Sequence, residues 1–583
     1  MFSMKITLAQ CIARTKVFVV ALFVCSSMVM AQKMQHTEML ARPADKEITV
    51  HVIFNEPAEA CVVYGTTRGN YTKQTAWQPA PADSSTEILL SKLQPNTQYY
   101  YRLVHRVPGS KDSVLRPEYT FHTARPKGET FSFIVQADPH ADENSDTTLY
   151  KRCLQNQLED QPDFLIDLGD IVMSDKLRNA AKQITHDTIT KRFHLLRSFY
   201  EIACHSMPLM ISMGNHEGES GWNLNSTPNN VAIYNAVDRK KYMLNPRPND
   251  FYTGDTSVAQ FVGPRENYYA WTWGDALFIV LDPYWYTMRK PDSLNGWRWS
   301  LGKGQYDWLR ATLEKSDAKF KFVFAHQIIG GDANGRGGVE YANKYEWGGG
   351  NIDGTPGFAA NRPGWYKPIK DLFKENRVTI FFHGHDHFFC KQQKDCLIYQ
   401  ETPQPSLPNF TNASQAEEYG YFEGQVLPNS GHLRVTVSPD GTRVDYVRVY
   451  LPANETTTRK NKDVSATYYI GARNCYDSLT TSVPTLWNAN YTSELVFPNP
   501  TDRITTVRLR MQSTDEAEIR ICDAQGNVIR HLLRPSIIEA GEYDIVWDGT
   551  TDSGEQVANG SYWSLVRSDR SGEVRSSKIM YVR

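Results

Sequence analysis

The sequence has no excess of charge of either sign, because 63 Lys and Arg residues face 65 Asp and Glu residues, for a formal net charge of −2. This balance excludes a general electrostatic affinity for nucleic acid or anionic lipid, so we expect no nucleic-acid binding. An aromatic content of 12% argues against disorder. With 583 residues the chain is too long for one hydrophobic core, and we expect several domains. No feature of the sequence indicates an oligomeric state.

Long hydrophobic runs are absent as well. The apolar run at residues 17–25 is too short to cross a bilayer core of about 30 Å. Basic residues precede this run, and Ala31 offers a small residue at a cleavage position before Gln32. We therefore predict a signal peptide over residues 1–31 and a mature chain that is secreted or displayed on the outer cell surface. The alternatives are a periplasmic location for the chain and a buried N-terminal element in place of the signal.

Cysteine is sparse and lacks the Cys-x-x-Cys spacing that is typical of zinc frameworks. Two of the nine cysteines, Cys11 and Cys25, lie in the predicted leader. Cys390 and Cys396 flank a short polar segment and could close a hairpin through a disulfide in an oxidising compartment. The sequence alone leaves open whether these two residues pair.

Three regions with different patterns follow the leader. The first and the last alternate short apolar and polar stretches between turn residues, which is typical of antiparallel β-sandwiches. In the middle, apolar runs are separated by helix-compatible stretches, which favours a layered α/β domain (α-β-β-α). We therefore predict an N-terminal sandwich at residues 40–125, an α/β domain at 129–452, a polar linker at 453–494 and a C-terminal Ig-like sandwich at 495–583.

Polar motifs follow the apolar runs of the middle region. The runs that precede them are residues 131–135, 164–168, 209–213, 320–324 and 378–382. The motifs contain two carboxylates, one amide and four imidazoles: Asp138, His140, Asp170, Asn215, His326, His385 and His387. Because ligands bind at the carboxyl ends of strands in an α/β sheet, we expect these side chains to converge.

Seven such donors are too many for one tetrahedral zinc ion, which takes four ligands. They suit two metal ions about 3.5–4 Å apart that share a bridging carboxylate. Oxygen and imidazole donors without thiolate favour Mn, Fe, Zn or Co over Cu(I) or an iron–sulfur cluster. Single motifs would be weak signals, since His326 alone could be a core histidine and the motif glycines could simply permit turns. The ordered series after five strands carries the inference.

The ordered motifs resemble the calcineurin-like metallophosphoesterase superfamily over residues 131–451. The preceding segment makes the chain similar to the purple acid phosphatase branch, with its fibronectin type III-like N-terminal domain, because Leu93 and Tyr99 match the corner of such a domain. The resemblance implies a first metal held by Asp138, His140 and His387, a bridging Asp170, and a second metal held by Asn215, His326 and His385. It also implies a catalytic His216 that, with Asn215, faces the substrate phosphate, and a Glu217 that steadies its neighbours.

The implied activity is hydrolysis of phosphate esters, with phosphomonoesters favoured, by attack of a metal-bound hydroxide. A phosphodiesterase or nucleotide hydrolase on the same site is one alternative, and a non-catalytic surface adhesin is another. The chain departs from purple acid phosphatases in two places: Met173 stands where they carry an iron-binding Tyr, and His140 where they carry Gly. We therefore predict an enzyme without the tyrosinate-to-iron colour, and an acidic pH optimum is not implied.

Two further segments bear on substrate and location. The Gly-rich residues 330–350 resemble a mobile rim in which Arg336 could grip a phosphate oxygen, although a solvated loop has the same composition. Trp222 and Asn223 are candidates for the pocket wall. The C-terminal region, with Trp547-Asp548-Gly549 and a basic end, resembles the sorting domain of type IX secretion, although other extracellular Ig-like modules share this hairpin. It implies the type IX secretion machinery as a partner.

Overall fold

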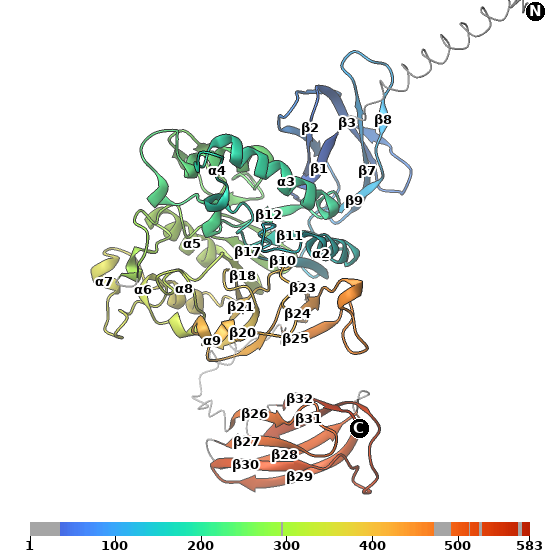
Figure 1. Ribbon diagram of the computed structural model, residues 1–583, viewed down its shortest axis with the longest axis vertical. Helices are drawn as coiled ribbons and strands as arrows, with labels where there is room; N and C mark the ends of the chain where they lie inside the picture. The colour runs from blue at the N-terminus through green and yellow to red at the C-terminus, as the bar shows by residue number, and fades with distance from the viewer. Residues whose placement is uncertain (1–34, 293–294, 472–490, 512–513, 524–526, 569–573) are drawn as a thin grey trace, which may run out of the picture. The chain divides into compact units, whose positions relative to one another are not determined.

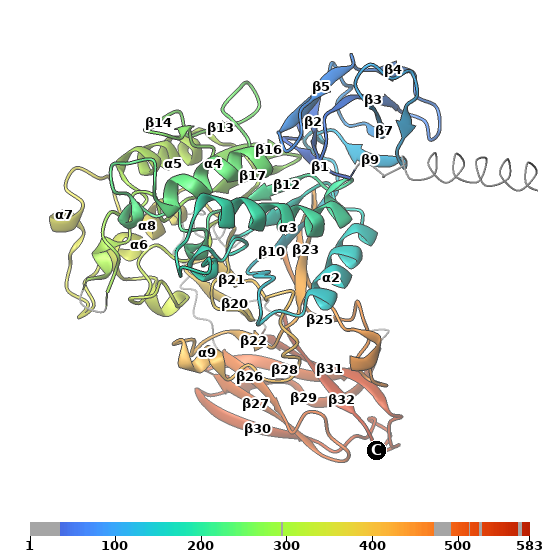
Figure 2. The ribbon, with the colours of Figure 1, turned by 45° about the horizontal axis from the view of Figure 1, so that its top comes forward.

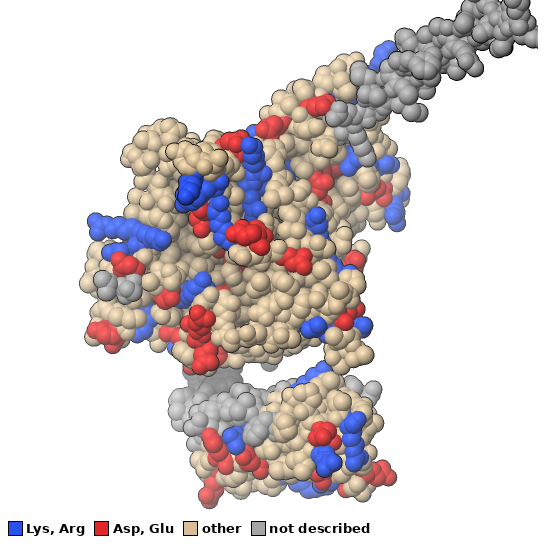
Figure 3. Space-filling model, viewed as in Figure 1, with Lys and Arg blue, Asp and Glu red and all other residues tan. Residues whose placement is uncertain are grey.

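The computed structural model describes residues 35–292, 295–471, 491–511, 514–523, 527–568 and 574–583. The chain divides into two compact units, Met1–Leu479 and Thr480–Arg583. No helix within the described ranges is long and apolar enough to cross a membrane. Lys and Arg residues are interspersed with Asp and Glu residues on the face drawn in Figure 3, in line with the small net charge.

The first unit begins with a β-rich N-terminal region. One sheet has the order β1 (His36–Ala41), β2 (Glu47–Phe54), β6 (Thr86–Ser91). The other is built on β3 (Ala58–Gly65) and β7 (Gln98–Arg106), with β4 (Lys73–Gln74), β5 (Gln78–Ala80), β8 (Val114–Leu115) and β9 (Tyr119–His122) at their edges. Side chains from both sheets form one core. Leu93 and Tyr99 belong to it, and the Tyr99 hydroxyl accepts a hydrogen bond from the Gln94 amide (2.9 Å), which fixes this corner.

The central domain contains two large sheets (Figure 1). The six-stranded sheet has the order β12 (Leu209–Ile211), β11 (Leu165–Asp167), β10 (Phe131–Gln136), β23 (Gly431–Ser438), β24 (Gly441–Arg448), β25 (Val464–Gly471). The eight-stranded sheet has the order β13 (Thr253–Gly254), β16 (Tyr269–Trp273), β17 (Ala276–Val280), β18 (Phe320–Phe324), β19 (Ile380–His383), β21 (Leu397–Glu401), β20 (Phe389–Lys394), β22 (Gln425–Leu427). The hairpin β14 (Val258–Ala259) and β15 (Gly263–Pro264) stands apart.

An aromatic core joins the two sheets. Phe133 of β10 contacts Phe164 beside β11 and Phe278 of β17, with ring centroids 5.5 and 5.0 Å apart. Alternate strand residues point the other way into a second core, against the helices. The helices are α2 (Thr147–Glu159), α3 (His186–Cys204), α4 (Val231–Tyr242), α5 (Lys303–Lys315), α6 (Tyr345–Gly348), α7 (Phe358–Asn361), α8 (Ile369–Glu375) and α9 (Gln415–Glu418). In Figures 1 and 2 helices α2 and α3 lie by β10–β12, and α6 and α8 lie beside the other sheet.

Strand direction places the polar motifs together. Strands β10, β11 and β12 run parallel to one another, and so do β17, β18 and β19. The carboxyl ends of each set therefore lie at one edge of its sheet, where the chain leaves through loops. The five motif-bearing runs do form strands, but the strands belong to two packed sheets and not to one sheet.

Part of the predicted linker at residues 453–494 is wrong. Residues 464–471 form β25, which pairs with β24 and is the edge strand of the six-stranded sheet. Ala466, Tyr468 and Ile470 of this strand pack against the core between the sheets, so the segment has the alternating apolar pattern of a strand with one buried face. This pattern and the pairing with β24 together account for the strand.

Cys390 and Cys396, whose pairing the sequence leaves open, do not form a disulfide with each other. Cys390 is a buried free thiol, whereas Cys396 belongs to a disulfide with another residue. The register of the β20–β21 hairpin explains why, because it places Cys390 opposite Glu401. Cys396 lies in the turn at the other end of the ladder, between β20 and β21.

The N-terminal region is joined to the central domain through α3. Arg197 on this helix is fully buried, and its guanidinium donates hydrogen bonds to the Thr37 hydroxyl (2.6 Å) and to the main-chain oxygens of Thr37 and His51 (3.1 and 3.2 Å). It also bonds the Tyr242 carbonyl on the end of α4 (2.6 Å). Met39 of β1 packs into the core of the central domain.

The second unit is a β-sandwich. One sheet has the order β26 (Tyr491–Phe497), β27 (Thr505–Met511), β30 (Gly541–Trp547), and the other has the order β29 (Val528–Ile538), β28 (Asp515–Cys522), β31 (Gly560–Ser568), β32 (Val574–Tyr581). The Trp547 ring packs against Tyr562 and Tyr581, with centroids 5.4 and 5.8 Å apart. The predicted C-terminal motifs therefore contribute to its core.

The 3₁₀ turns of the first unit are η1 (Ser174–Lys176), η2 (Asn215–Glu217), η3 (Gly221–Asn223), η4 (Gly296–Arg298), η5 (Val339–Tyr341) and η6 (Pro452–Asn454).

Candidate metal centre

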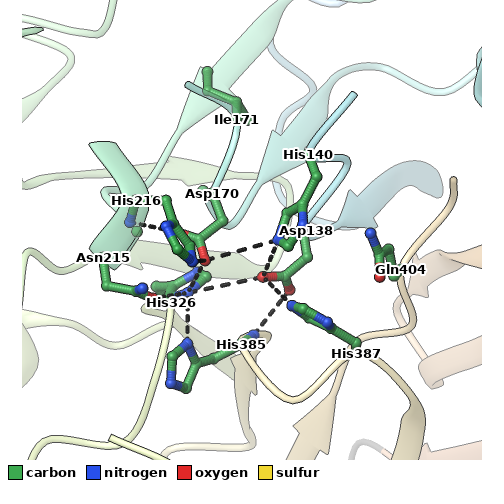
Figure 4. A network of polar contacts seen from close by, with 12 residues as sticks. Asp138, His140, Asp170, Ile171, Asn215, His216, His326, His385, His387 and Gln404 are labelled. Atoms are coloured by element: carbon green, nitrogen blue, oxygen red, sulfur yellow. Dashed lines mark hydrogen bonds and ion pairs between the residues drawn. The ribbon is translucent and has the colours of Figure 1, made fainter. Parts of the chain in front are cut away.

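The seven predicted ligands meet at the carboxyl ends of the parallel strands (Figure 4). Asp138 and His140 follow β10, Asp170 follows β11, Asn215 opens η2 after β12, His326 follows β18, and His385 and His387 follow β19. Segments that are far apart in the sequence thus supply one cluster, as the motif series predicts.

One group of potential ligands consists of Asp138, His140 and His387, whose donor atoms all lie within 4.8 Å of one another. Asp138 Oδ1 is 3.4 Å from His387 Nε2 and 3.8 Å from His140 Nε2. Both Asp138 Oδ1 and His140 Nε2 are buried without a hydrogen-bond partner. A buried polar atom without a partner is costly, so these atoms are arranged for a ligand of their own.

A second group consists of Asp170, His326 and His385. His326 Nε2 is 3.1 Å from each of three atoms: Asp170 Oδ2, Asn215 Oδ1 and His385 Nδ1. The two groups abut, because Asp170 Oδ2 is 4.0 Å from His140 Nε2, and Asp138 Oδ1 is 3.8 Å from His326 Nε2. Asp170 therefore faces donors of both groups.

Main-chain groups orient several of these side chains. The Leu168 carbonyl lies 3.0 Å from His326 Nδ1, and the Asn334 carbonyl lies 2.8 Å from His385 Nε2. When each imidazole donates its N–H to that carbonyl, its other nitrogen faces the cluster without a proton. The second oxygen of Asp138 accepts the His385 amide at 2.8 Å.

The backbone at the cluster is strained. Asp138, His140, Asp170, His385 and His387 have φ angles of 56°, 47°, 58°, 79° and 67°. Residues with a side chain rarely adopt this left-handed region, and each such residue costs on the order of 1–3 kcal/mol unless the surroundings impose it. Strain shared by five of the seven predicted ligands supports a functional role for this arrangement.

Two motif glycines provide space for the carboxylates. A Cβ added to Gly384 would lie 2.6 Å from Asp138 Oδ2, and one added to Gly214 would collide with the amide and carboxylate of Asp170. These glycines allow backbone to approach the carboxylates closely, which goes beyond the tight turns that the sequence alone suggests.

The electrostatic field of the cluster favours positive charge. Burial disfavours ionisation of Asp138, but His326 and His387 outweigh it and hold the pKa of this carboxyl well below its usual range. Burial also opposes charge on His326, yet Asp170 and Asp138 raise the pKa of its imidazole to about 10. The field that retains a proton on His326 would equally favour a cation, whose binding releases such protons.

His216 stands beside the cluster, with a side chain that is 27% exposed. Its Nδ1 is 2.6 Å from Asp175 Oδ1, and its Nε2 is 4.0 Å from Asp170 Oδ2. Burial acts against charge on this ring, but Asp170 and Asp175 raise the pKa of His216 to about 9.

Glu217 does not point into the cluster. Its buried carboxylate accepts hydrogen bonds from the main-chain amides of Asp170 (3.0 Å), Ile171 (2.7 Å) and Val172 (3.2 Å), and from the amide of Gly214. It ties the loop after β11 to η2. This geometry agrees with the supporting role that the resemblance implies.

A cavity of about 410 Å³ opens beside the cluster. Asp170, Asn215, His216, His385 and His387 form its inner end. The rest of its lining includes the predicted Trp222, Asn223 and Arg336, together with Ser174, Asp175, Ile184, Gly218, Val231, Lys290, Pro291, Trp299, Ala333 and Asn334.

Arg336 is held firmly at this cavity. Its Nη1 donates a hydrogen bond to Asp386 Oδ1 (2.8 Å), and its guanidinium stacks over the Tyr419 ring at 3.8 Å. Asp386 also accepts the Gly337 amide (3.1 Å) and the Tyr421 hydroxyl (2.7 Å). The predicted rim residue is therefore anchored to the motif that carries His385 and does not sit on a freely solvated loop.

Sequence reasoning missed four residues of this site. Asp386 lies between His385 and His387 in the sequence, so its position between two imidazoles could have indicated a role. Asp175 and Asn334 offered no such signal, because they reach His216 and His385 only through the fold of their loops. Lys290 reaches the cavity from the loop after β17, and the sequence gives no signal for this position either.

Comparison with known proteins agrees with this geometry. Residues 131–389 match the family of calcineurin-like phosphoesterases, and residues 501–572 match the family of FlgD Ig-like domains. No curated protein matches the chain.

Two solved structures are similar to this chain, and the first has a similar fold over most of it. PhoD is similar with a TM-score of 0.54 and 15% identity, over 75% of this chain and 90% of that one. Purple acid phosphatase PPD1 from yellow lupin (Lupinus luteus) gives a TM-score of 0.48 and 15% identity, over 74% of each chain. The family match identifies residues 131–389 as a calcineurin-like phosphoesterase domain, and together with the converged donors it supports a metal-dependent phosphoesterase.

Proposed function

We propose that the protein is an exported hydrolase that cleaves phosphate monoesters at a centre of two metal ions. The observation that carries this proposal is the pair of abutting donor groups, with Asp170 Oδ2 facing both. We assign one ion to Asp138, His140 and His387, the other to Asn215, His326 and His385, and the bridging position to Asp170. A single tetrahedral metal ion would bind four of these seven donors and leave three unused.

The donors fit divalent transition metals. The orphaned Asp138 Oδ1 and His140 Nε2, and a set of oxygens and imidazoles without thiolate, suit Mn, Fe or Zn. When bound, two such cations neutralise phosphate charge and lower the pKa of a water molecule, so that it can attack phosphorus near neutral pH. Met173 replaces the Tyr of purple acid phosphatases, so we expect the iron-loaded protein to lack the tyrosinate absorption band.

The protein's own residues then position the ester and move protons. His216 presents Nε2 to the cavity while Asp175 holds Nδ1, so the ring can donate a proton from Nε2 to the departing oxygen. General acid catalysis of this kind contributes about 10²–10⁴-fold to the rate. Arg336 lines the same cavity with its orientation set by Asp386, and we assign it to a phosphate oxygen of the substrate.

Steady-state kinetics test the preference for monoesters. Purified protein reconstituted with Mn²⁺ should hydrolyse p-nitrophenyl phosphate with a higher kcat/KM than bis(p-nitrophenyl) phosphate. Faster turnover of the bis ester would overturn the proposal in favour of a phosphodiesterase. The family match and the converged donors favour an enzyme over a non-catalytic adhesin.

We also propose export and surface sorting. The predicted signal peptide at residues 1–31 lies outside the described residues, and the support for export is its sequence pattern. Support for type IX sorting is the C-terminal motif set, on a domain that matches FlgD Ig-like domains. We likewise propose that the N-terminal region is fibronectin type III-like.

Two experiments test export and sorting. N-terminal sequencing of the secreted protein should find Gln32 first, and deletion of residues 495–583 should abolish secretion. An uncleaved chain would contradict the signal peptide, and a truncated chain that is still secreted would contradict sorting by the C-terminal domain.

A further inference from the structure

The lining of the cavity beside the metal centre combines polar and apolar side chains. Its polar part includes Asn334, Arg336 and Lys290. Its apolar part, which we call the apolar wall, consists of Ile184, Trp222, Val231, Pro291 and Trp299. The volume of about 410 Å³ lies within the range of small-molecule sites and leaves room for more than a phosphate group.

The apolar wall presents hydrophobic surface that the fold itself does not cover. Ile184, Trp222 and Val231 pack against the main core yet stay only partly buried, and the surface they leave open borders the cavity. Apolar surface inside a cavity with a few polar groups at one end is the usual composition of a ligand pocket.

Neighbouring aromatic rings hold Trp222 in place. Its ring meets Trp299 and Tyr284 edge-to-face, with centroids 6.0 and 6.4 Å away. Trp299 is fixed in turn by a hydrogen bond from its indole nitrogen to the Asp332 carbonyl (3.2 Å), and Tyr284 by one from its hydroxyl to Gln327 (2.6 Å). The apolar wall is thus preorganised, so its side chains lose little conformational entropy when a planar group binds.

Resting on the proposed phosphomonoesterase activity, we propose that the preferred substrate is a phosphate ester of an aromatic alcohol. Its phosphate lies at the metal centre and its ring lies against Trp222 on the apolar wall. Trp222 is then a specificity-determining residue for the leaving group, because contact between aromatic rings adds to the burial of apolar area.

Binding of two phosphonates that cannot be hydrolysed tests this proposal. Calorimetry on the Mn²⁺-loaded protein should show phenylphosphonate binding more tightly than ethylphosphonate. Trp222→Leu should weaken phenylphosphonate by about 10-fold and leave ethylphosphonate within about 2-fold, since an aromatic contact contributes on this scale. Trp222→Phe should restore most of the affinity.

The matched control is Trp365→Leu, which removes another partly buried Trp packed on the same core but away from the cavity. It should change neither affinity. Equal weakening of both phosphonates by Trp222→Leu, or equal affinity of the unaltered protein for both, would overturn the aromatic preference while leaving the phosphoesterase proposal standing. If the unaltered protein bound neither compound, the phosphate site itself, and with it both proposals, would be contradicted.

Discussion

At the scale of single residues, the metal centre depends on side chains that face one another from separate strands. Asp170 and Asp138 each approach a histidine of the other group, because Asp170 Oδ2 lies 4.0 Å from His140 Nε2 and Asp138 Oδ1 lies 3.8 Å from His326 Nε2. We assign the bridging position to Asp170, as the resemblance implies. Asn215 and His385 approach only the second group, and His216 lies outside both. Substitutions at these positions should therefore differ in metal content as well as in rate.

The first prediction separates these roles. Asn215→Ala and His385→Ala should each lose about one metal ion per chain, because each removes a donor from the second group. His216→Ala should retain both ions and lose activity by about 10²–10⁴-fold, the contribution of a general acid. Metal analysis beside phosphatase assays checks this, and equal metal loss in all three variants would contradict the assignment.

The second prediction concerns the space beside Asp138. Gly384→Ala places a Cβ 2.6 Å from Asp138 Oδ2, so the carboxylate must move and metal affinity should fall by at least about 10-fold, as for disturbed supporting contacts. Gly304→Ala is the control, because its Cβ meets nothing within 4 Å in α5, and it should stabilise the helix by up to about 1 kcal/mol. Metal titration of both variants tests this prediction. Unchanged metal affinity in Gly384→Ala would contradict it, because the loop would then move without weakening metal binding.

At the scale of elements, α3 connects the N-terminal region to the central domain. Arg197 supplies this connection with its buried hydrogen bonds to β1, β2 and the end of α4. Burial lowers the pKa of its guanidinium to about 9, which shows that the charge is retained at a cost. The hydrogen bonds to main-chain oxygens offset that cost.

The third prediction follows from these bonds. Arg197→Met keeps much of the volume but removes the guanidinium hydrogen bonds to the Thr37, His51 and Tyr242 carbonyl oxygens, so the free energy of unfolding should fall by about 3 kcal/mol. Lys191→Met on the exposed side of α3 should change it by less than about 0.5 kcal/mol. Denaturant unfolding measures both, and a similar small effect for the two variants would mean that α3 does not fix the N-terminal region.

Elements also mark where sequence reasoning succeeded. The motif-bearing strands were predictable because each is a continuous apolar run, which a doubly covered strand requires, followed by residues with obvious chemistry. Strand β25 was not predicted, although its apolar residues alternate, because it lies between polar stretches. Asp175 and Asn334 were not either, because loop conformation and not spacing brings them to His216 and His385.

At the scale of the whole molecule, pH should affect stability through Glu38. This residue of β1 is buried, and neither of its carboxylate oxygens has a hydrogen-bond partner. Burial raises the pKa of Glu38 from 4.5 to about 8. Between these values the folded chain holds a proton that the unfolded chain has released, so the free energy of unfolding falls as pH rises.

The fourth prediction is that Glu38→Gln flattens this dependence. The slope removed is at most about 1.4 kcal/mol per pH unit between roughly pH 5 and 8, the value for one proton. Glu129→Gln, which alters an exposed carboxylate, should leave the profile unchanged. Thermal unfolding at several pH values tests both, and parallel curves for the parent protein and Glu38→Gln would refute the role of this carboxyl.

The central claim is that one cluster holds two metal ions around Asp170, and metal stoichiometry tests it most directly. Purified protein stripped of metal, reloaded with Mn²⁺ or Zn²⁺ and dialysed should contain two ions per chain by elemental analysis. Asp170→Asn should contain fewer than one and lose phosphatase activity. A single ion in the parent protein, or two ions retained in Asp170→Asn, would contradict the account.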